Sequence, residues 1–218
     1  MSSDQVADPQ VQRRRAELEA NMARAAQAPH LRQDCCLRPG EDLWVFGYGS
    51  LMWHPGIPHV ETRVGTLHGF HRRFCIVSNR YRGTVEKPGL VLGLDRGGSC
   101  RGLLFRVPPG EVETAPDYLH EREMMTRVYR PQRRQVATDR GPVSALCFIV
   151  DRRHSQYTGR LSLEETARII AEAAGQRGPC SDYLANTVGH LEALGVGAGS
   201  LKQLLRLVEC HCRERRGG

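Results

Sequence analysis

An apolar run that ends abruptly in a glycine-rich turn constrains this chain more than any other feature. Residues 43–46 read Leu-Trp-Val-Phe, which is typical of a buried strand. The chain then changes at once to Gly47-Tyr48-Gly49-Ser50. Glycine lets a partner approach the backbone closely, and successive N–H groups that point into one hollow bind anions such as carboxylates. A lone Gly-x-Gly favours an ordinary turn, so an anion cradle needs support from elsewhere in the sequence.

Two later segments supply that support. One is Arg82-Gly83-Thr84 with Lys87-Pro88-Gly89, and the other is YLHEREMMT at residues 118–126, followed by Tyr129-Arg130-Pro131. Together with VFGYGSLMW at residues 45–53, and in this order, they resemble the γ-glutamylcyclotransferases, in particular the ChaC family that degrades glutathione. The resemblance runs from about Asp42 to about Val208. Three motifs in the right order are far more specific than one.

The resemblance implies a small, mostly antiparallel β-barrel flanked by helices, with the active site at its mouth. It implies that the α-amine of a γ-glutamyl group attacks its own γ-carbonyl, which converts glutathione to 5-oxoproline and Cys-Gly. The substrate supplies the nucleophile, so no metal and no cofactor are expected. The protein must fold the substrate into a reactive geometry, move protons and stabilise an oxyanion.

The residue pattern independently favours an α+β fold, because strands, a helix, more strands and then helices follow one another. Strands are expected over residues 43–46, 60–67, 70–78, 90–94, 103–107, 128–137 and 143–150. Helices are expected over residues 11–28, 116–125, 162–174 and 181–194, with a last one through 201–208. Gly69 should end the second strand and let 60–67 pair with 70–78. Asp95, Gly97 and Gly98 should form a turn between 90–94 and 103–107.

Glu123 is the candidate catalytic acid/base. The resemblance places the family's catalytic glutamate at this position, in Arg122-Glu123-Met124. Apolar neighbours would desolvate the carboxylate and raise its pKa into a useful range. Spacing alone favours the opposite interpretation, a solvated helix glutamate paired with Arg122 or Arg127. Glu121, two residues earlier, should point to another face of the helix.

The candidate substrate-binding residues follow from the same resemblance. They are Val45, Phe46, Gly47, Tyr48, Gly49, Ser50, Leu51, Arg82 and Tyr129. The N–H groups of the turn would hold the γ-glutamyl α-carboxylate or the developing oxyanion, Tyr129 would orient the carboxylate, and Arg82 would meet the glycyl carboxylate. Phe46 and Tyr48 are equally compatible with places in the core, and Tyr129 with an ordinary strand tyrosine.

Charge and composition fit a globular protein with a small-molecule substrate. The formal net charge is +7, but the basic residues are scattered and no nucleic-acid-binding module carries them. The charge fits either a basic surface and tail or a modest attraction for an anionic substrate. The eight cysteines show no paired Cys-x-x-Cys spacing, which argues against a structural zinc site. We expect no nucleic-acid partner, and the oligomeric state stays open.

Three regions are expected along the chain. Residues 1–41 should form a helical arm and linker, 42–212 the γ-glutamylcyclotransferase domain, and 213–218 a basic tail without fixed structure. The arm carries Val11, Leu18, Met22 and Ala25 on one apolar stripe, which would pack on the domain or on another subunit.

No secretory signal and no membrane-spanning stretch is recognisable, so a cytoplasmic location is expected. Two alternatives remain: cyclisation of other γ-glutamyl amino acids or amines, or a γ-glutamyl-binding module without catalysis.

Overall fold

The fold is described from a computed structural model, for residues 8–26, 40–112 and 114–217. The described elements, in chain order, are α1 (Pro9–Ala26), β1 (Leu43–Gly47), the 3-10 turn η1 (Ser50–Met52), β2 (Glu61–Ser78), β3 (Gly89–Val107), η2 (Pro109–Glu111), α3 (Ala115–Glu123), β4 (Tyr129–Val136), β5 (Val143–Val150), α4 (Leu163–Glu172), β6 (Ala174–Gly175), β7 (Gly178–Pro179), α5 (Cys180–Ala193) and α6 (Ser200–Gly217). The expected helix over 11–28 is confirmed as far as Ala26, and residues 27 and 28 lie outside the described part.

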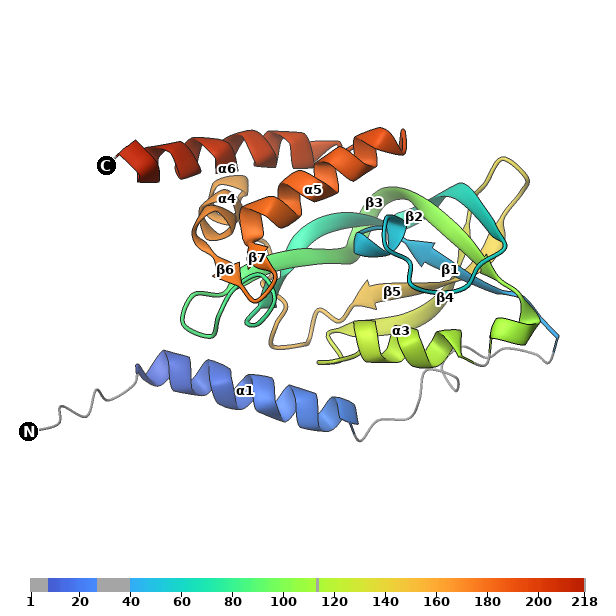
Figure 1. The fold of residues 1–218 in the computed structure, drawn as a ribbon, viewed down its shortest axis with the longest axis horizontal. Coiled ribbons are helices and arrows are strands. Elements are labelled where there is room, and N and C mark those ends of the chain that lie inside the picture. Colours follow the sequence, from blue (N-terminus) through green and yellow to red (C-terminus); the bar gives the residue numbers. More distant parts are fainter. Residues whose placement is uncertain (1–7, 27–39, 113, 218) are drawn as a thin grey trace, which may run out of the picture.

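A curled, mostly antiparallel sheet forms the centre of the molecule (Figure 1). Its strand order is β2-β3-β1-β5-β4, with a further parallel contact between β3 and β5. Thr66 of β2 and Ala137, just after β4, exchange two backbone hydrogen bonds of 2.8 and 2.9 Å. This bridge brings the two outer strands of the sheet together at one point, so the sheet forms a half-barrel. The expected α+β class is confirmed.

The four short strands expected between residues 60 and 107 are in fact two long ones. β2 and β3 pair along their whole length, from Glu61 opposite Arg106 to Ser78 opposite Gly89. The expected pairing of 60–67 with 70–78 is therefore wrong, and so is the expected turn at 95–98. Gly69 has a φ of +83° and lies at an irregularity between the pairs His68–Ser99 and Phe70–Arg96. A glycine with positive φ forms a bulge inside a ladder as readily as it forms a turn.

The helices cover the half-barrel unevenly. α4 and α5 pack on β3, and α6 packs across both of them. In Figure 1, α1 and α3 lie below the sheet, whereas α5 and α6 lie above it. α4 begins with a capping box, in which Ser162 and Glu165 satisfy each other's backbone amides. α6 continues as a helix to Gly217, so the expectation of an unstructured tail from Arg213 is wrong up to that residue.

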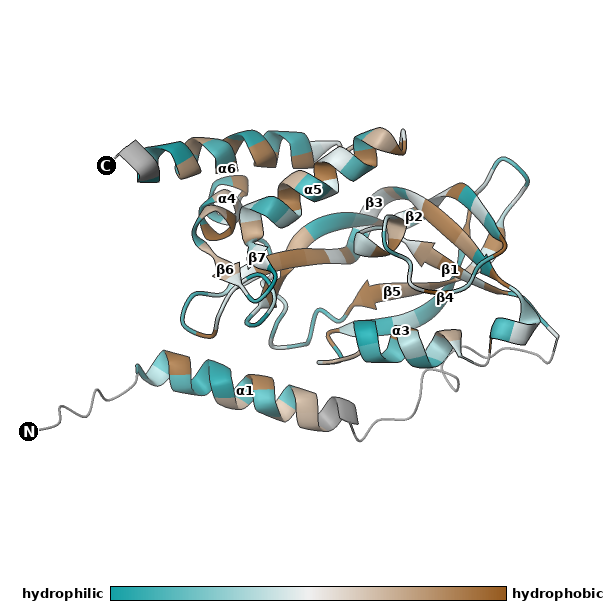
Figure 2. Ribbon diagram, viewed as in Figure 1, coloured by the Kyte–Doolittle hydropathy of each residue, from teal (hydrophilic) through white to brown (hydrophobic). Residues whose placement is uncertain are grey.

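The core lies inside the curl of the sheet. Figure 2 shows brown, apolar residues along β1, β3 and β5, and a mixture of polar and apolar residues along α1 and α6. Phe46, Leu94, Leu104 and Phe148 are completely buried there. β5 is interior, between β1 and β4, and its sequence is nearly continuously apolar. The core therefore fixes the end of β1, from which the glycine-rich turn leaves.

Candidate active site

A cavity of about 790 Å³ opens where the turn after β1, the end of α3 and the segment after β2 meet. This volume is within the range of small-molecule sites in proteins. Its polar lining residues are Ser50, His54, Ser78, Asn79, Arg80, Tyr81, Arg82, Tyr118, Glu121, Arg122, Glu123, Thr126, Tyr129, Gln156, Arg177, Tyr183 and Asn186. The cavity thus brings Glu123, Tyr129, Arg82 and Ser50 together, although they lie far apart in the sequence.

Glu123 is the last residue of α3 and lines this cavity. Its side chain is only 15% exposed, and the following residue, Met124, is only 2% exposed. Burial raises the pKa of the Glu123 carboxyl above its usual range, and the Arg122 guanidinium opposes that rise. The ion pair with Arg122 exists, but the carboxylate is not on a solvated helix face. A carboxyl of raised pKa that lines a cavity is suited to take up and release a proton during a reaction.

Arg122 connects the end of α3 to the turn after β1. Its Nε lies 3.1 Å from Oε1 of Glu123, and its Nη2 donates to the hydroxyl oxygen of Ser50 at 3.0 Å. Its Nη1 donates to the carbonyl of His54 at 2.5 Å and to the hydroxyl of Tyr118 at 3.0 Å. A guanidinium can satisfy several acceptors in one plane. The arginine of the Arg-Glu-Met block therefore fixes both the carboxylate and the turn.

Glu121, which is expected on another face of the helix than Glu123, also lines the cavity, and its side chain is exposed. The two glutamates therefore differ in burial rather than in which cavity they border.

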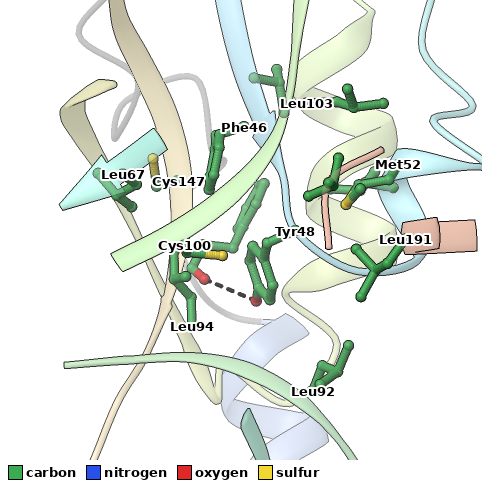
Figure 3. Close-up of a cluster of buried hydrophobic side chains, with 14 of the residues drawn as sticks. Phe46, Tyr48, Met52, Leu67, Leu92, Leu94, Cys100, Leu103, Cys147 and Leu191 are labelled. Carbon is green, nitrogen blue, oxygen red and sulfur yellow. Dashed lines mark hydrogen bonds between the residues drawn. The ribbon is translucent and has the colours of Figure 1, made fainter. Parts of the chain in front are cut away.

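Most side chains of the glycine-rich turn lie in the core. Val45 and Phe46 are completely buried, and Leu51 is 5% exposed. Tyr48 is also buried and donates its hydroxyl to the carbonyl of Phe148 at 3.0 Å (Figure 3). Of residues 45–51, Ser50 is the one that lines the cavity. A substrate in the cavity would therefore meet this turn through Ser50 and through the backbone.

The backbone of the turn retains free donors. The carbonyl of Tyr48 accepts from Arg72 Nε at 2.7 Å, and the carbonyl of Gly49 accepts from the Met52 amide at 2.8 Å. Within the described residues, no acceptor faces the amides of Gly49 and Ser50. Gly49 has a φ of −138°, so the turn does not depend on positive φ at this glycine. Two neighbouring amides without protein acceptors are suitable donors for an anion.

Tyr129 and Tyr183 line the cavity beside Glu123. Tyr129 donates its hydroxyl to the carbonyl of Leu92 at 2.8 Å. Burial raises the pKa of both phenols, and the negative charge of Glu123 adds to the effect. Both tyrosines therefore stay protonated. Because the proton of Tyr129 is already donated to Leu92, its oxygen presents only lone pairs to a substrate.

Arginines gather at the other part of the lining, on the segment after β2. Arg82 donates through Nη1 to the carbonyls of Arg177 and Pro179, at 2.6 and 3.2 Å, and its guanidinium lies 5.2 Å from the centre of the Tyr183 ring. Arg80 and Arg177 line the same region. Arg82 thus lines the cavity, and its role toward a substrate stays a prediction. Grouped guanidinium groups suit the recognition of a carboxylate.

Several lining residues carried no recognisable sequence signal. Arg177 lies between β6 and β7, Tyr183 on α5 and Gln156 after β5. Asn79 and Gln156 each have a buried amide oxygen without a partner within the described residues. These residues reach the cavity only through long-range folding, so their spacing in the sequence gives no pattern. Buried acceptors without partners favour a ligand that brings N–H donors.

The described residues include no group of three or more His, Cys, Asp or Glu side chains arranged to hold a metal ion. The described cysteines are free thiols: Cys75, Cys100, Cys147, Cys180, Cys210 and Cys212. None of these lines the cavity. In the same part of the chain, no helix has the length and apolar character needed to cross a bilayer.

Comparison with known proteins finds relatives of this chain. The family model described as ChaC-like protein matches residues 43–211. The glutathione-specific gamma-glutamylcyclotransferase of Escherichia coli is 38% identical over 181 residues, which is 82% of this chain and 78% of that protein. The human glutathione-specific gamma-glutamylcyclotransferase 1 is 31% identical, over 70% of this chain and 71% of its own length.

A solved structure shows the same fold. The crystal structure of a glutathione-specific γ-glutamyl cyclotransferase from yeast superposes with a TM-score of 0.71 and 22% identity. The match covers 78% of this chain and 96% of the yeast chain. The family match spans well over half of the sequence and includes the turn after β1, the end of α3 and Tyr129. The chain therefore belongs to the ChaC-like family.

Proposed function

We propose that this protein cyclises the γ-glutamyl group of glutathione and releases 5-oxoproline and Cys-Gly. The observation that carries the proposal is the Glu123 carboxyl, which lies largely buried on a cavity lined by arginines. The family membership and the names of the relatives support the substrate. A cytoplasmic location is part of the proposal, and the free thiols of the described cysteines are compatible with it.

Glu123 is assigned the proton transfers. As a carboxylate it removes a proton from the substrate's ammonium group, which frees the α-nitrogen to attack the γ-carbonyl carbon. The new C–N bond closes the five-membered ring, and the carbonyl oxygen becomes an oxyanion. Glu123 then gives this proton to the cysteinyl nitrogen as the old C–N bond breaks. The regenerated carboxylate takes the second proton from the ring nitrogen, which becomes the lactam N–H, and passes it to the released amine of Cys-Gly, which leaves as an ammonium group.

The turn after β1 is proposed to bind a negatively charged group of the substrate. The amides of Gly49 and Ser50 have no acceptor within the described residues, and they are proposed to hold the oxyanion or the γ-glutamyl α-carboxylate. Ser50 is fixed by Arg122, which also pairs with Glu123. The base and the anion site are therefore held in a constant relation to each other. Val45, Phe46, Gly47, Tyr48 and Leu51 are proposed to support this turn from the core.

Tyr129 is assigned to the substrate's amino group rather than to its carboxylate. Its hydroxyl proton is donated to Leu92, so a carboxylate would meet only lone pairs. An ammonium group, in contrast, can donate a hydrogen bond to that oxygen. Arg82 is assigned to the glycyl carboxylate, which places the leaving peptide at the arginine-rich part of the cavity.

One assay separates this function from its alternatives. The protein is incubated with glutathione and, separately, with γ-Glu-Ala, and 5-oxoproline is measured. Release from glutathione well above release from γ-Glu-Ala supports the proposal. Preference for γ-Glu-Ala would indicate a cyclotransferase for other γ-glutamyl compounds. Binding of glutathione without any 5-oxoproline would indicate a binding module.

A further inference from the structure

α1 lies outside the residues that the family model matches, yet it borders the cavity. The family match begins at residue 43, whereas α1 spans Pro9–Ala26. Leu18 and Met22 of this helix line the same cavity as Glu123. They are four residues apart, so they share one face of the helix. The N-terminal arm thus contributes an apolar surface to a site that is otherwise made by the family domain.

Polar contacts hold α1 in this position. Asn21, only 7% exposed, donates its side-chain amide to the hydroxyl of Ser155 at 3.1 Å. Arg14 donates to the carbonyl of Val85 at 3.4 Å, and Arg15 pairs with Glu86 at 3.4 Å. The helix is therefore attached to the loop before β3 and to the segment after β5 (Figure 1). Asn21 lies between the two cavity-lining residues in the sequence, which fixes their face towards the cavity.

The attachment points show which part of the cavity α1 borders. Ser155, which binds Asn21 of α1, is followed directly by Gln156, which lines the cavity. Residues 85 and 86, which bind the two arginines of α1, follow closely on Arg82, which also lines the cavity. This is the arginine-rich part, where the proposed function places the leaving peptide. Among the described residues, none of these hydrogen bonds and ion pairs involves α3, which carries Glu123. Leu18 and Met22 are therefore placed to contact the leaving group rather than the reacting γ-glutamyl group.

We propose that Leu18 and Met22 form a specificity-determining wall that limits the size of the leaving group, an inference that rests on the proposed function. Apolar side chains add no charge requirement, so they select by volume and by apolar contact. The cysteinyl side chain of glutathione fits against such a wall. A glutathione that carries a bulky alkyl group on sulfur would collide with it. The wall comes from this chain's arm and would be lost if α1 were not docked.

The test compares two substrates in the full-length protein. The ratio of kcat/KM for S-hexylglutathione to that for glutathione is measured through 5-oxoproline release. Leu18→Ala combined with Met22→Ala should raise this ratio about tenfold or more, because removed methylene groups open room for the hexyl chain. Glu19→Ala, an exposed position on the same helix, should leave the ratio unchanged. An unchanged ratio in the double variant would overturn the proposal.

A second variant works in the opposite direction and guards against misfolding. Met22→Trp adds volume to the wall and should raise KM for glutathione more than it lowers kcat. If a normally folded Met22→Trp protein keeps the KM of the wild-type protein, the proposal that Met22 limits the size of the leaving group is also contradicted. If the wild-type protein releases no 5-oxoproline, the proposed function fails on its own. The wall is then tested by calorimetric binding of the same two ligands to the same variants, with the same expected change in their ratio.

Discussion

Arg122 and Glu123 form an ion pair, 3.1 Å from Nε to Oε1, at the end of α3, and the same guanidinium binds Ser50 of the turn after β1. The arginine therefore acts on the pKa of the proposed base and on the place of the turn at once. Burial raises the pKa of Glu123, and Arg122 limits that rise. The Arg-Glu-Met block combines these two effects in adjacent residues.

Arg122→Gln should shift the pH profile of the enzyme. Without the guanidinium, the pKa of Glu123 rises further, so a higher pH is needed to form the carboxylate. We expect the acidic limb of the kcat/KM profile to move to higher pH, with partial recovery of activity as the pH is raised. The measurement is 5-oxoproline release across the pH range. A profile that keeps its midpoint while activity falls uniformly would contradict a role of Arg122 in setting this pKa.

Glu123→Gln should change stability in a pH-dependent manner. A carboxyl whose pKa is raised by folding contributes its full stability below its ordinary pKa of 4.5 and loses it as the pH rises through the raised value. Glutamine does not ionise, so the Glu123→Gln variant does not lose this stability as the pH rises. The Tm of the variant relative to wild type should therefore increase as the pH rises above the ordinary carboxyl pKa of 4.5. A difference in Tm that does not depend on pH would contradict the raised pKa.

Arg82→Gln should weaken glutathione binding through one carboxylate. A hydrogen bond to a charged group contributes about 1.5–3 kcal/mol, so KM should rise at least about tenfold while kcat changes little. The glycyl monoethyl ester of glutathione lacks that charge and serves as the matched substrate. Its KM should be similar for the variant and the wild-type protein. An equal loss for both substrates would show that Arg82 acts on the fold of the loop and not on the carboxylate.

Gly83→Ala should disturb the loop that carries Arg80 and Arg82. A Cβ at Gly83 would lie 2.0 Å from the backbone nitrogen of Gly89 and 2.6 Å from the carbonyl oxygen of Ser78. Backbone atoms cannot move aside as a flexible side chain can, so we expect a destabilisation of about 1–3 kcal/mol. Urea unfolding measures it. Gly110→Ala, where a Cβ would have no neighbour within 4 Å, is the control.

The parts that the sequence predicted are those with local signals. The strand expected over residues 43–46 and the helices expected over 162–174 and 181–194 depend on neighbouring residues, and all three are confirmed as β1, α4 and α5. Gly69 and Gly97 were misread because a glycine marks a turn and a bulge alike. The long-range pairing of β2 with β3 decides between the two, and no short window of sequence contains it.

The site was predictable only in part for the same reason. Motif resemblance located Glu123, Arg82 and Tyr129, all of which line the cavity. It also assigned Val45 and Leu51 to substrate binding, but their side chains are in the core. Motif matching treats a contiguous stretch as one unit, whereas a strand alternates its faces and a turn exposes its backbone. Tyr183 and the α1 residues enter the cavity from distant segments, so no motif includes them.

The central claim is that Glu123 moves the protons of the cyclisation. Glu123→Gln keeps the size of the side chain but cannot accept a proton, so turnover should fall by roughly 10²–10⁴ while glutathione binding by calorimetry survives. Glu121→Gln is the matched control, since Glu121 borders the same cavity with an exposed side chain, and it should stay within a few-fold of wild type. The measurement is 5-oxoproline release by both variants. An active Glu123→Gln protein, whether or not Glu121→Gln loses activity, would contradict the mechanism.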